Sequence, residues 1–589
     1  MNITHPLKIA LIGTALFITG CGGSSDTAST SVPSANSPTN TATSNSTSTT
    51  SASSPSNNTS STTIQNASTT PQDAARFLTQ ATFGPTMAEI EKVAQYGLAS
   101  WLDEQVNAPI SSHRAKTLAI FNADQNAKDN NADSPWGGHR YGAWMDIALH
   151  GEDQLRQRVA FALSQLFVVS DKSILDGQQL DVAGYYDGLA EHAFGNYRDL
   201  LEYVTLSPVM GVYLNMLGNE KPDLANNIRP DENYAREVMQ LFTIGLDELN
   251  LDGSLKLNNG KPIPTYNIDI VKAYAHVFTG WHFRGTTADT WHRWWQNRNF
   301  RNPMTLVPEY HAQDVRKELL NNVIVEPGTD GETAMQMALD SLFEHPNVGP
   351  FVAKHIIRRL VTSNPTPQYI ARVAQVFNDD GSGVRGNLEA VVRATLLDDE
   401  ARKPISEQAS SFGKVKEPII RGMQLIRAFG IYKDGELGPQ WLEYPHNQAP
   451  LAAPSVFNFF LDDFSPVGQL ADLGLAAPEM QIINDTYMVR NSNHAGWWSM
   501  WVPTAEEVDS GHNRGMTIDY AQFTPMLAQN VAPFIDYLDL VLLSGAMSDE
   551  MRTAMIDYDN QAKQWLDDRE RIQELVFLVT GSPQFAVQR

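Results

Sequence analysis

One short stretch, RPDENYAREVMQLFTIG at residues 229–245, offers the carboxylates, amides and arginine that acid–base chemistry uses. At about 100° per residue, a helix over this stretch places its polar side chains on one side and its apolar ones on the other. That polar face is either an ordinary solvated surface with an i,i+4 ion pair or the wall of a functional site. Its residues are Glu232, Asn233, Arg236, Glu237 and Gln240.

Helices must position these residues, because apolar residues recur three and four positions apart from about residue 73 onward. Alternating strand patterns are few, and the best is NNVIVEP at 321–327. We therefore predict an all-α family domain over residues 71–589 with little β structure and with long Trp-, Gly- and Pro-rich loops at 282–310 and 433–475. The predicted helices lie within 74–83, 153–169, 196–214, 269–281, 349–362, 367–377, 387–399, 416–430 and 536–544.

The N-terminus has the pattern of an export signal. A lone cation, Lys8, precedes an apolar run over 9–18, which is too short to span a membrane. The run ends in ITGC at 18–21, which resembles the lipobox of bacterial lipoproteins, in which the cysteine is lipidated. We expect residues 1–20 to be a signal peptide and Cys21 to carry a lipid anchor; the alternative is an ordinary secretory signal that contains a cysteine. Gly22 after the cysteine favours the outer membrane, on its periplasmic or cell-surface side.

Composition limits the partners. Residues 21–70 are almost wholly Ser, Thr, Asn, Ala and Pro, so we expect a disordered tether that reaches roughly 40 Å from the anchor. The formal net charge is -24 and the pI is about 4.9, so the surface repels nucleic acid. A single cysteine excludes a disulfide framework and a thiolate zinc site.

A loop between two predicted helices has the spacing of an EF-hand calcium loop. In NDDGSGVRGNLE at 378–389, oxygen-bearing side chains alternate, a glycine takes the sharp turn and a glutamate ends the loop. The alternative is a Gly-rich turn in which Asn387 caps the next helix. A dinucleotide-binding interpretation of GSGVRG is excluded, because a helix is predicted before it where that motif needs a strand. The predicted calcium ligands are Asn378, Asp380, Ser382 and Glu389.

Tryptophans cluster in two predicted loops. GWHFRGTTADTWHRWW at 280–295 and HAGWWSMW at 494–501 hold seven of the twelve tryptophans, so these loops could stack on sugar faces while neighbouring polar groups meet hydroxyls. The alternative is that each loop forms a small satellite core. The residues are Trp281, Trp291, Trp294, Trp295, Trp497, Trp498 and Trp501.

Several motifs in order resemble one bacterial secreted family, named domain of unknown function eighteen hundred. ENYAREVMQLFTIGL at 232–246 is similar to its signature, AARFLTQATFGPT at 74–86 to its opening helix, and DIVKAYAHVFTGW at 269–281 to its threonine-glycine-tryptophan element. YHAQDVRKELL at 310–320 resembles its histidine-lysine element, and LVTGSPQFAVQR its C-terminal ending. The resemblance covers residues 74–589. It implies an exported protein, often encoded beside a phosphatase-like partner, and no settled activity.

The resemblance also implies a set of polar positions. The chain departs from the family pattern at Gln240 and Asn215, where the family has acids. The set is either a cleft with acid, base or metal-ligating groups or a buried salt-bridge network that fixes helix register. Its residues are Glu232, Asn233, Arg236, Glu237, Asp269, Thr279, Trp281, His311 and Lys317.

We expect the function to be hydrolytic or lytic processing of a surface or periplasmic polysaccharide. The candidate catalytic residues are Glu232, Glu237, Asp269 and His311, with a glutamate as general acid and Asp269 as base or nucleophile. Two glutamates five positions apart on a helix diverge by about 140°, so the second carboxylate should come from another helix. The candidate substrate-binding residues are Asn233, Arg236, Thr279, Trp281 and Lys317, with the indole as sugar platform.

Two other hypotheses remain open. In one, the protein is a non-catalytic helical binding protein or scaffold for the phosphatase-like partner. In the other, His311 and the acids form a metal site.

Overall fold

The computed structural model describes residues 69–172, 174–433, 437–510 and 516–589, which all belong to one unit. The predicted signal peptide, the predicted lipidation site Cys21 and all but the last two residues of the predicted tether lie outside the described residues. Within the described part, no helix is both long enough and apolar enough to cross a bilayer.

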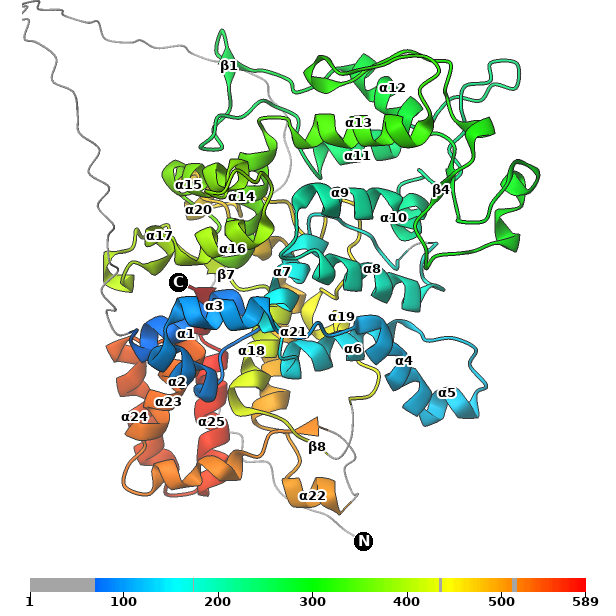
Figure 1. Cartoon of the computed structure of the whole chain (residues 1–589). Coiled ribbons are helices and arrows are strands. Elements are labelled where there is room, and N and C mark those ends of the chain that lie inside the picture. The colour runs from blue at the N-terminus through cyan, green and yellow to red at the C-terminus, as the bar shows by residue number, and fades with distance from the viewer. Residues whose placement is uncertain (1–68, 173, 434–436, 511–515) are drawn as a thin grey trace, which may run out of the picture. The chain divides into compact units, whose positions relative to one another are not determined.

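The described chain is predominantly α-helical, which confirms the predicted fold class (Figure 1). Helix starts follow the capping chemistry of the sequence: Thr70 accepts the backbone N–H of Asp73 at the start of the first helix. The predicted helix over 196–214 is two helices, because Pro208 cannot continue a helix and starts a new one. The N-terminal helices are α1 (Pro71–Ala81), α2 (Met87–Tyr96), α3 (Leu98–Val106), α4 (His113–Ala123), α5 (Gln125–Asp129), α6 (Gly137–His150), α7 (Gln154–Ser164), α8 (Gln179–Glu191), α9 (Tyr197–Leu206) and α10 (Pro208–Tyr213).

The middle of the chain contains the family-like motifs. The signature helix α11 is short and is in contact with α12, which in turn packs against α13. The helices are α11 (Asn233–Gln240), α12 (Ile268–Val277), α13 (Gly331–Phe343), α14 (Val348–Leu360), α15 (Pro367–Asn378), α16 (Leu388–Leu397), α17 (Asp399–Arg402) and α18 (Pro418–Phe429), with the 3-10 helices η1 (Ala288–Gln296), η2 (Pro308–Tyr310), η3 (Leu320–Asn322) and η4 (Ile405–Glu407).

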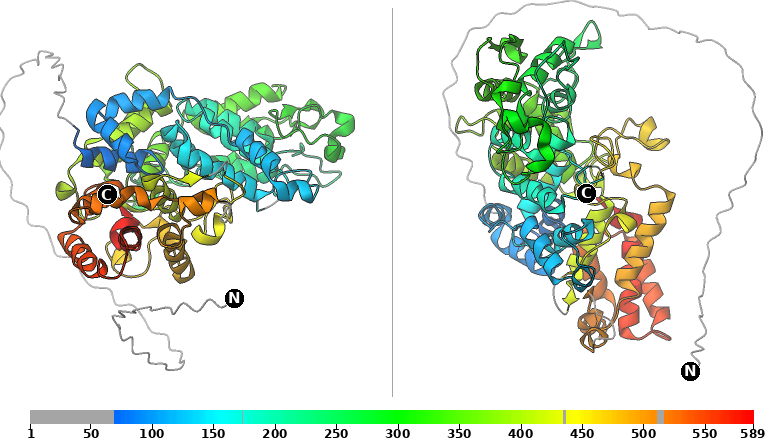
Figure 2. Two further views of the ribbon diagram at one scale, coloured as in Figure 1. Left: turned by 90° about the horizontal axis from the view of Figure 1, so that it is seen from below. Right: turned by 90° about the vertical axis from the view of Figure 1, so that its right-hand side faces the viewer.

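The C-terminal part places α23, α24 and α25 side by side (Figures 1 and 2), and α21 packs against α18, α19 and α25. The predicted loop at 433–475 contains two short helices. The second tryptophan cluster, predicted in a loop, lies largely on α21. The elements are α19 (Glu443–His446), α20 (Gln469–Asp472), η5 (Pro478–Gln481), α21 (Asp485–Ser499), α22 (Ala505–Asp509), η6 (Tyr520–Leu527), α23 (Ala532–Leu543), α24 (Asp549–Ala562), α25 (Asp568–Thr580) and α26 (Pro583–Ala586).

Strands in the described ranges are two residues long and form antiparallel pairs that pin loops. The strand β6 lies within the predicted segment 321–327. The pairs are β1 (Leu257–Asn258) with β2 (Lys261–Pro262), β3 (Trp281–His282) with β4 (Thr305–Leu306), β5 (Lys317–Glu318) with β6 (Ile324–Val325), β7 (Lys414–Val415) with β10 (Val587–Gln588), and β8 (Tyr432–Lys433) with β9 (Met516–Thr517).

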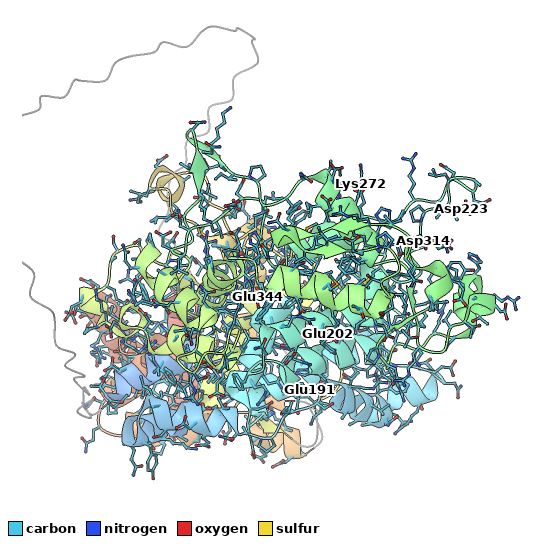
Figure 3. All side chains as sticks on the ribbon, turned by 45° about the horizontal axis from the view of Figure 1, so that its top comes forward. Glu191, Glu202, Asp223, Lys272, Asp314 and Glu344 are labelled. Carbon is cyan, nitrogen blue, oxygen red and sulfur yellow. The ribbon has the colours of Figure 1, made fainter. Side chains whose placement is uncertain are left out.

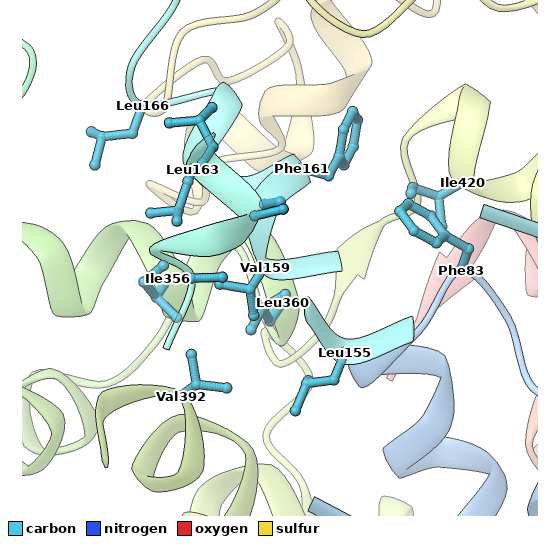
Figure 4. Close-up of a cluster of buried hydrophobic side chains, with 14 of the residues drawn as sticks. Phe83, Leu155, Val159, Phe161, Leu163, Leu166, Ile356, Leu360, Val392 and Ile420 are labelled. Atoms are coloured by element: carbon cyan, nitrogen blue, oxygen red, sulfur yellow. The ribbon is translucent and has the colours of Figure 1, made fainter. Parts of the chain in front are cut away.

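One hydrophobic cluster runs through the described helices. In Figure 4, Leu155 and Val159 of α7 lie close to Ile356 and Leu360 of α14, and all four are buried. Residues four apart on each helix face the same neighbour, so this i,i+4 spacing produces the contact. The core therefore fixes α14, and α11 packs onto the same cluster through Val238.

Candidate functional site

The polar face of α11 divides between solvent and interior. Glu232 and Arg236 form a partly exposed i,i+4 pair with an Oε2 to Nη2 distance of 2.6 Å. The backbone N–H of Asn233 donates to the Asp231 carboxylate, 2.8 Å away. Exposed pairs of this kind contribute about 0–1 kcal/mol, so this part of the face behaves as ordinary surface.

Glu237 is different, because it is only partly exposed and its Oε2 is buried with no hydrogen-bond partner among the described residues. Burial raises the pKa of Glu237, and the nearby Arg236 opposes that rise. Burial also raises the pKa values of Tyr213 and Tyr266, and the Glu237 carboxylate adds to both rises. A half-buried carboxyl with a raised pKa among tyrosines has the profile of a general acid.

The structure brings Thr279, His311 and Lys317 together in a buried group. The hydroxyl of Thr279 donates to the His276 carbonyl at 2.7 Å and accepts the Ala312 N–H at 2.9 Å. His311 Nδ1 lies 2.9 Å from the Thr279 carbonyl oxygen. These bonds tie the turn after α12 to the loop that starts at His311.

Lys317 completes this group. Its ammonium donates to the Ala312 carbonyl at 2.7 Å and to the Val315 carbonyl at 3.2 Å, and burial lowers the pKa of Lys317 to about 8. Burial also lowers the pKa of His311. Because these polar side chains mainly satisfy backbone groups, their arrangement supports a role in holding the loop rather than in binding substrate.

The positions of Trp281 and Asp269 do not suit the roles predicted for them, a sugar platform and a catalytic base or nucleophile. Trp281 is 4% exposed, so its indole cannot serve as an open sugar platform. Asp269 is the opposite case: its side chain is 86% exposed in the first turn of α12, 3.9 Å from Lys272, which Figure 3 shows at the outside of the molecule. An exposed carboxylate and a half-buried one do not share an environment, so the geometry gives no support to Asp269 as the partner of Glu237.

The described ranges contain no group of three or more His, Cys, Asp or Glu side chains placed to hold a metal ion. The hypothesis of a metal site at His311 therefore has no donor set in the described part of the chain.

The predicted calcium loop does not fit calcium. The Asp380 carboxylate accepts the Ser382 hydroxyl at 2.7 Å, the side-chain amide N–H of Asn387 at 2.8 Å and the Ser382 backbone N–H at 2.8 Å. These bonds hold the pKa of Asp380 well below its usual range. Arg385 donates to the side-chain oxygen of Asn378, and Glu389 pairs with Arg393 at 2.8 Å. The Arg385 guanidinium therefore occupies the Asn378 oxygen that a calcium ion would need as a ligand. Asn387 caps α16 by accepting the Ala390 N–H, so the alternative prediction of a capped Gly-rich turn is confirmed.

The first tryptophan cluster is also interior where it is described. Trp291 is buried, stacks on Tyr310 with ring centroids 4.1 Å apart, and donates to Glu220 at 2.8 Å. The interpretation as a satellite core holds for Trp281 and Trp291; nothing is described of the side chains of 294–296.

The second cluster contributes to an open aromatic surface, which we call the aromatic groove. Its volume is about 930 Å³, and it lies between the segment 440–445 and the outward face of α21 with the residues that follow. The exposed fractions of its rings are 71% for Trp441, 66% for Tyr444, 66% for Trp497 and 67% for Trp501. Polar groups at the same cavity come from Gln440, Arg490 and Asn493.

The sequence of α21 explains how the groove forms. Arg490, His494, Trp497 and Trp501 are spaced by four, three and four, so they share one side of the helical path. The opposite side buries only small residues, Gly496 and Ser499. A Cβ at position 496 would lie 3.3 Å from Phe577 of α25, so glycine permits the close packing of the two helices. The helix thus buries Gly496 and Ser499 and exposes the large ring of Trp497.

His494 lines the groove, and the buried His446 lies behind it. His494 Nε2 accepts the Trp498 indole N–H at 3.2 Å, and the buried ring of His446 meets His494 edge-on with centroids 4.7 Å apart. Burial lowers the pKa of His494 to about 4 and holds that of His446 below its usual range, so both rings are neutral at neutral pH. The two histidines therefore add no charge to the groove.

Sequence reasoning found Trp497, Trp498 and Trp501 as a cluster and missed Trp441, Tyr444, Arg490 and Asn493. The signal that was available is the helical spacing from Arg490 to Trp501, which predicts one shared face. Nothing in the local pattern of 440–445 predicts its position beside α21, because that contact is long-range.

Comparison with protein-family models gives one match, to the family described as protein of unknown function (DUF1800), over residues 76–587. Comparison with curated proteins and with solved structures gave no match. The match spans nearly all of the chain outside its N-terminal 75 residues and includes α11, the group at Thr279 and the aromatic groove. The chain belongs to the DUF1800 family.

Proposed function

We propose that this protein is an exported polysaccharide-binding protein that holds a saccharide chain in the aromatic groove. The observation that carries the proposal is the ring of three tryptophans and one tyrosine, each about two-thirds exposed, around a cavity of about 930 Å³. Functional pockets for small ligands usually have about 300–1,000 Å³.

The exposure of these rings has a cost that a function would explain. Burying a large aromatic side chain stabilises a fold by about 1.5–3 kcal/mol, yet α21 buries Gly496 and Ser499 and leaves Trp497 exposed. Exposed apolar patches of this kind mark interaction sites.

The chemistry of the groove favours a sugar over a purely apolar ligand. Flat rings offer apolar faces on which the C–H faces of pyranose rings can stack, and an amide or guanidinium at the rim can bond the hydroxyls at the ring edge. Gln440, Arg490 and Asn493 supply such groups. Because the lining His494 is neutral and the Arg490 guanidinium packs on the rings of Tyr444 and Tyr487, a neutral polysaccharide fits best.

The N-terminal pattern is consistent with this role. A lipid anchor at Cys21 and a Ser- and Thr-rich tether of about fifty residues would hold the domain near an outer membrane with freedom to reach roughly 40 Å. A binding domain on such a tether could follow a surface or periplasmic polymer.

A second candidate function is carboxylate-dependent processing of the polysaccharide, and Glu237 favours it. Its raised pKa and its buried oxygen without a hydrogen-bond partner in the described structure suit a general acid. This candidate needs a second carboxylate from another element. Release of reducing ends by the wild type but not by Glu237→Gln, with saccharide affinity unchanged, would support it.

The test of the binding proposal is calorimetric titration of the full chain with cellohexaose, xylohexaose and chitohexaose. Trp497→Ala and Trp441→Ala should each weaken binding by about tenfold, which is about 1.4 kcal/mol. Trp565→Ala is the matched control, since Trp565 is 65% exposed on the turn between α24 and α25 and does not line the groove.

Equal weakening in the Trp565 control, or no binding of any of the three sugars, would contradict the proposal. In the latter case the remaining hypothesis is a scaffold for the phosphatase-like partner, and the groove variants would be tested for loss of that complex.

A further inference from the structure

A second cavity, of about 370 Å³, lies where the end of α11 meets α14 and the loop 456–463. The α14 side presents Phe351, Lys354, His355 and Arg358, which are spaced by three, one and three and so share one helix face. The facing wall includes Gln240, the last polar residue of the signature helix, and the apolar Leu241 and Ile244. The lining thus combines apolar side chains with cations on the α14 side.

Lys354 is the unusual member of this wall. It is partly buried, yet no ion pair or hydrogen bond of its ammonium is formed with any residue in the described ranges. Asp247, Asp462 and Asp463 also line the cavity, but none of the three forms an ion pair with Lys354. Burial lowers the pKa of Lys354 and Arg358 lowers it further, while the carboxylates of Asp462 and Asp463 oppose this effect from beyond ion-pair distance. The lysine therefore lacks a close anion among the described residues.

Arg358 lies one turn after Lys354, and only part of its hydrogen-bonding capacity is satisfied. Its Nη1 donates to the backbone carbonyl of Asp462 at 3.0 Å, while its Nε is buried without a partner in the part of the chain that the structure describes. Its neighbour Arg359 is already paired with the Asp462 carboxylate. The edge of Arg358 that contains Nε is the edge that binds a carboxylate through two parallel hydrogen bonds.

His355 adds a neutral group. Burial lowers the pKa of His355 to about 4, and its Nε2 lies 2.9 Å from the Ala162 carbonyl. The two groups left to meet a ligand charge are therefore Lys354 and Arg358, in a protein whose formal net charge is -24. A local pair of cations in so acidic a chain is a specific feature rather than a general property of the surface.

We propose that this cavity binds an organic carboxylate. The carboxylate is chelated by Arg358 and paired with Lys354, and the body of the ligand lies against Phe351, Leu241 and Ile244. Two kinds of ligand contain such a carboxylate. One is a sugar acid, whose ring would lie against Phe351, and the other is a short fatty acid, whose chain would lie against Leu241 and Ile244. The cavity is separate from the aromatic groove, since no residue lines both.

The test is calorimetric titration of the full chain with galacturonate and hexanoate, each beside its neutral counterpart, galactose or hexanol. We expect one of the two carboxylates to bind in a saturable way and its neutral counterpart to bind at least about tenfold more weakly, since hydrogen bonds to charged groups are the stronger ones. Galacturonate binding identifies a sugar acid, and hexanoate binding a fatty acid.

The variants separate binding from folding. Lys354→Met should lower affinity about tenfold and leave the melting temperature unchanged or higher, because it removes a partly buried charge that forms no ion pair or hydrogen bond in the described structure. Arg358→Lys keeps the charge and removes Nε, and it should also weaken binding. Lys403→Met, on the exposed turn after α17, and Trp497→Ala should change nothing.

Absence of saturable binding by both carboxylates, equal binding of the neutral counterparts, or full affinity in Lys354→Met would each overturn the proposal. None of these outcomes depends on whether the aromatic groove binds a polysaccharide.

Discussion

The guanidinium carbon of Arg490 lies 4.4 Å from the ring centroid of Tyr444 and 5.0 Å from that of Tyr487. One of these rings belongs to α19 and the other to the first turn of α21. The cation therefore links the two sides of the aromatic groove at its edge and orients the exposed ring of Tyr444.

Replacement of Arg490 tests this link. Arg490→Lys keeps the charge but loses the planar stacking, so we expect saccharide affinity to fall about two- to fivefold, equivalent to about 0.5–1 kcal/mol. Calorimetric titration measures the change. Arg316→Lys, on an exposed loop, is the control, and a matching loss there would remove the argument for stacking.

Thr279→Val tests the buried group after α12. The valine cannot accept the Ala312 N–H, so a buried donor loses its partner, and we expect a loss of about 1–3 kcal/mol in the free energy of unfolding. Urea unfolding measures it. Saccharide binding should be unchanged, and a specific loss of binding at unchanged stability would instead assign Thr279 to a binding site.

Glu237 should give the stability a pH dependence with a definite sign. Its pKa in the folded state is raised above the value of about 4.3 in an unfolded chain, so the folded state binds more protons between the two values. The free energy of unfolding should therefore fall as pH rises from about 4.3 through the folded pKa.

The measurement compares wild type and Glu237→Gln by urea unfolding from acid to neutral pH. The difference between them should shift in favour of the variant as pH rises, because glutamine does not titrate. A difference independent of pH would show that burial of Glu237 does not perturb its ionisation.

The loop at 378–389 should be indifferent to calcium. The Asp380 carboxylate and the Asn378 side-chain oxygen are bonded within the loop, and Glu389 pairs with Arg393, so neither calcium nor a chelator should move the melting temperature. Asp380→Ala should lower the melting temperature without calcium, because it removes the bonds that shape the turn. A calcium-dependent rise that Asp380→Ala abolishes would restore the EF-hand prediction.

The aromatic groove and the cavity beside α14 show which features local sequence patterns can predict and which they cannot. The periodicity of KHIIRR in 354–359 predicts a helix, and α14 is that helix, but the pattern alone cannot tell a solvated lysine from one that faces a cavity. The facing wall comes from residues more than a hundred positions earlier, at the end of α11.

The sequence by itself determined the helical class, most helix positions and the family, because these depend on short-range periodicity, capping residues and ordered motifs. Only the tertiary structure decided which polar residues meet. It buried Thr279, His311, Lys317 and Trp281, left Asp269 in solvent and opened the tryptophans of α21, because burial depends on which faces distant helices cover.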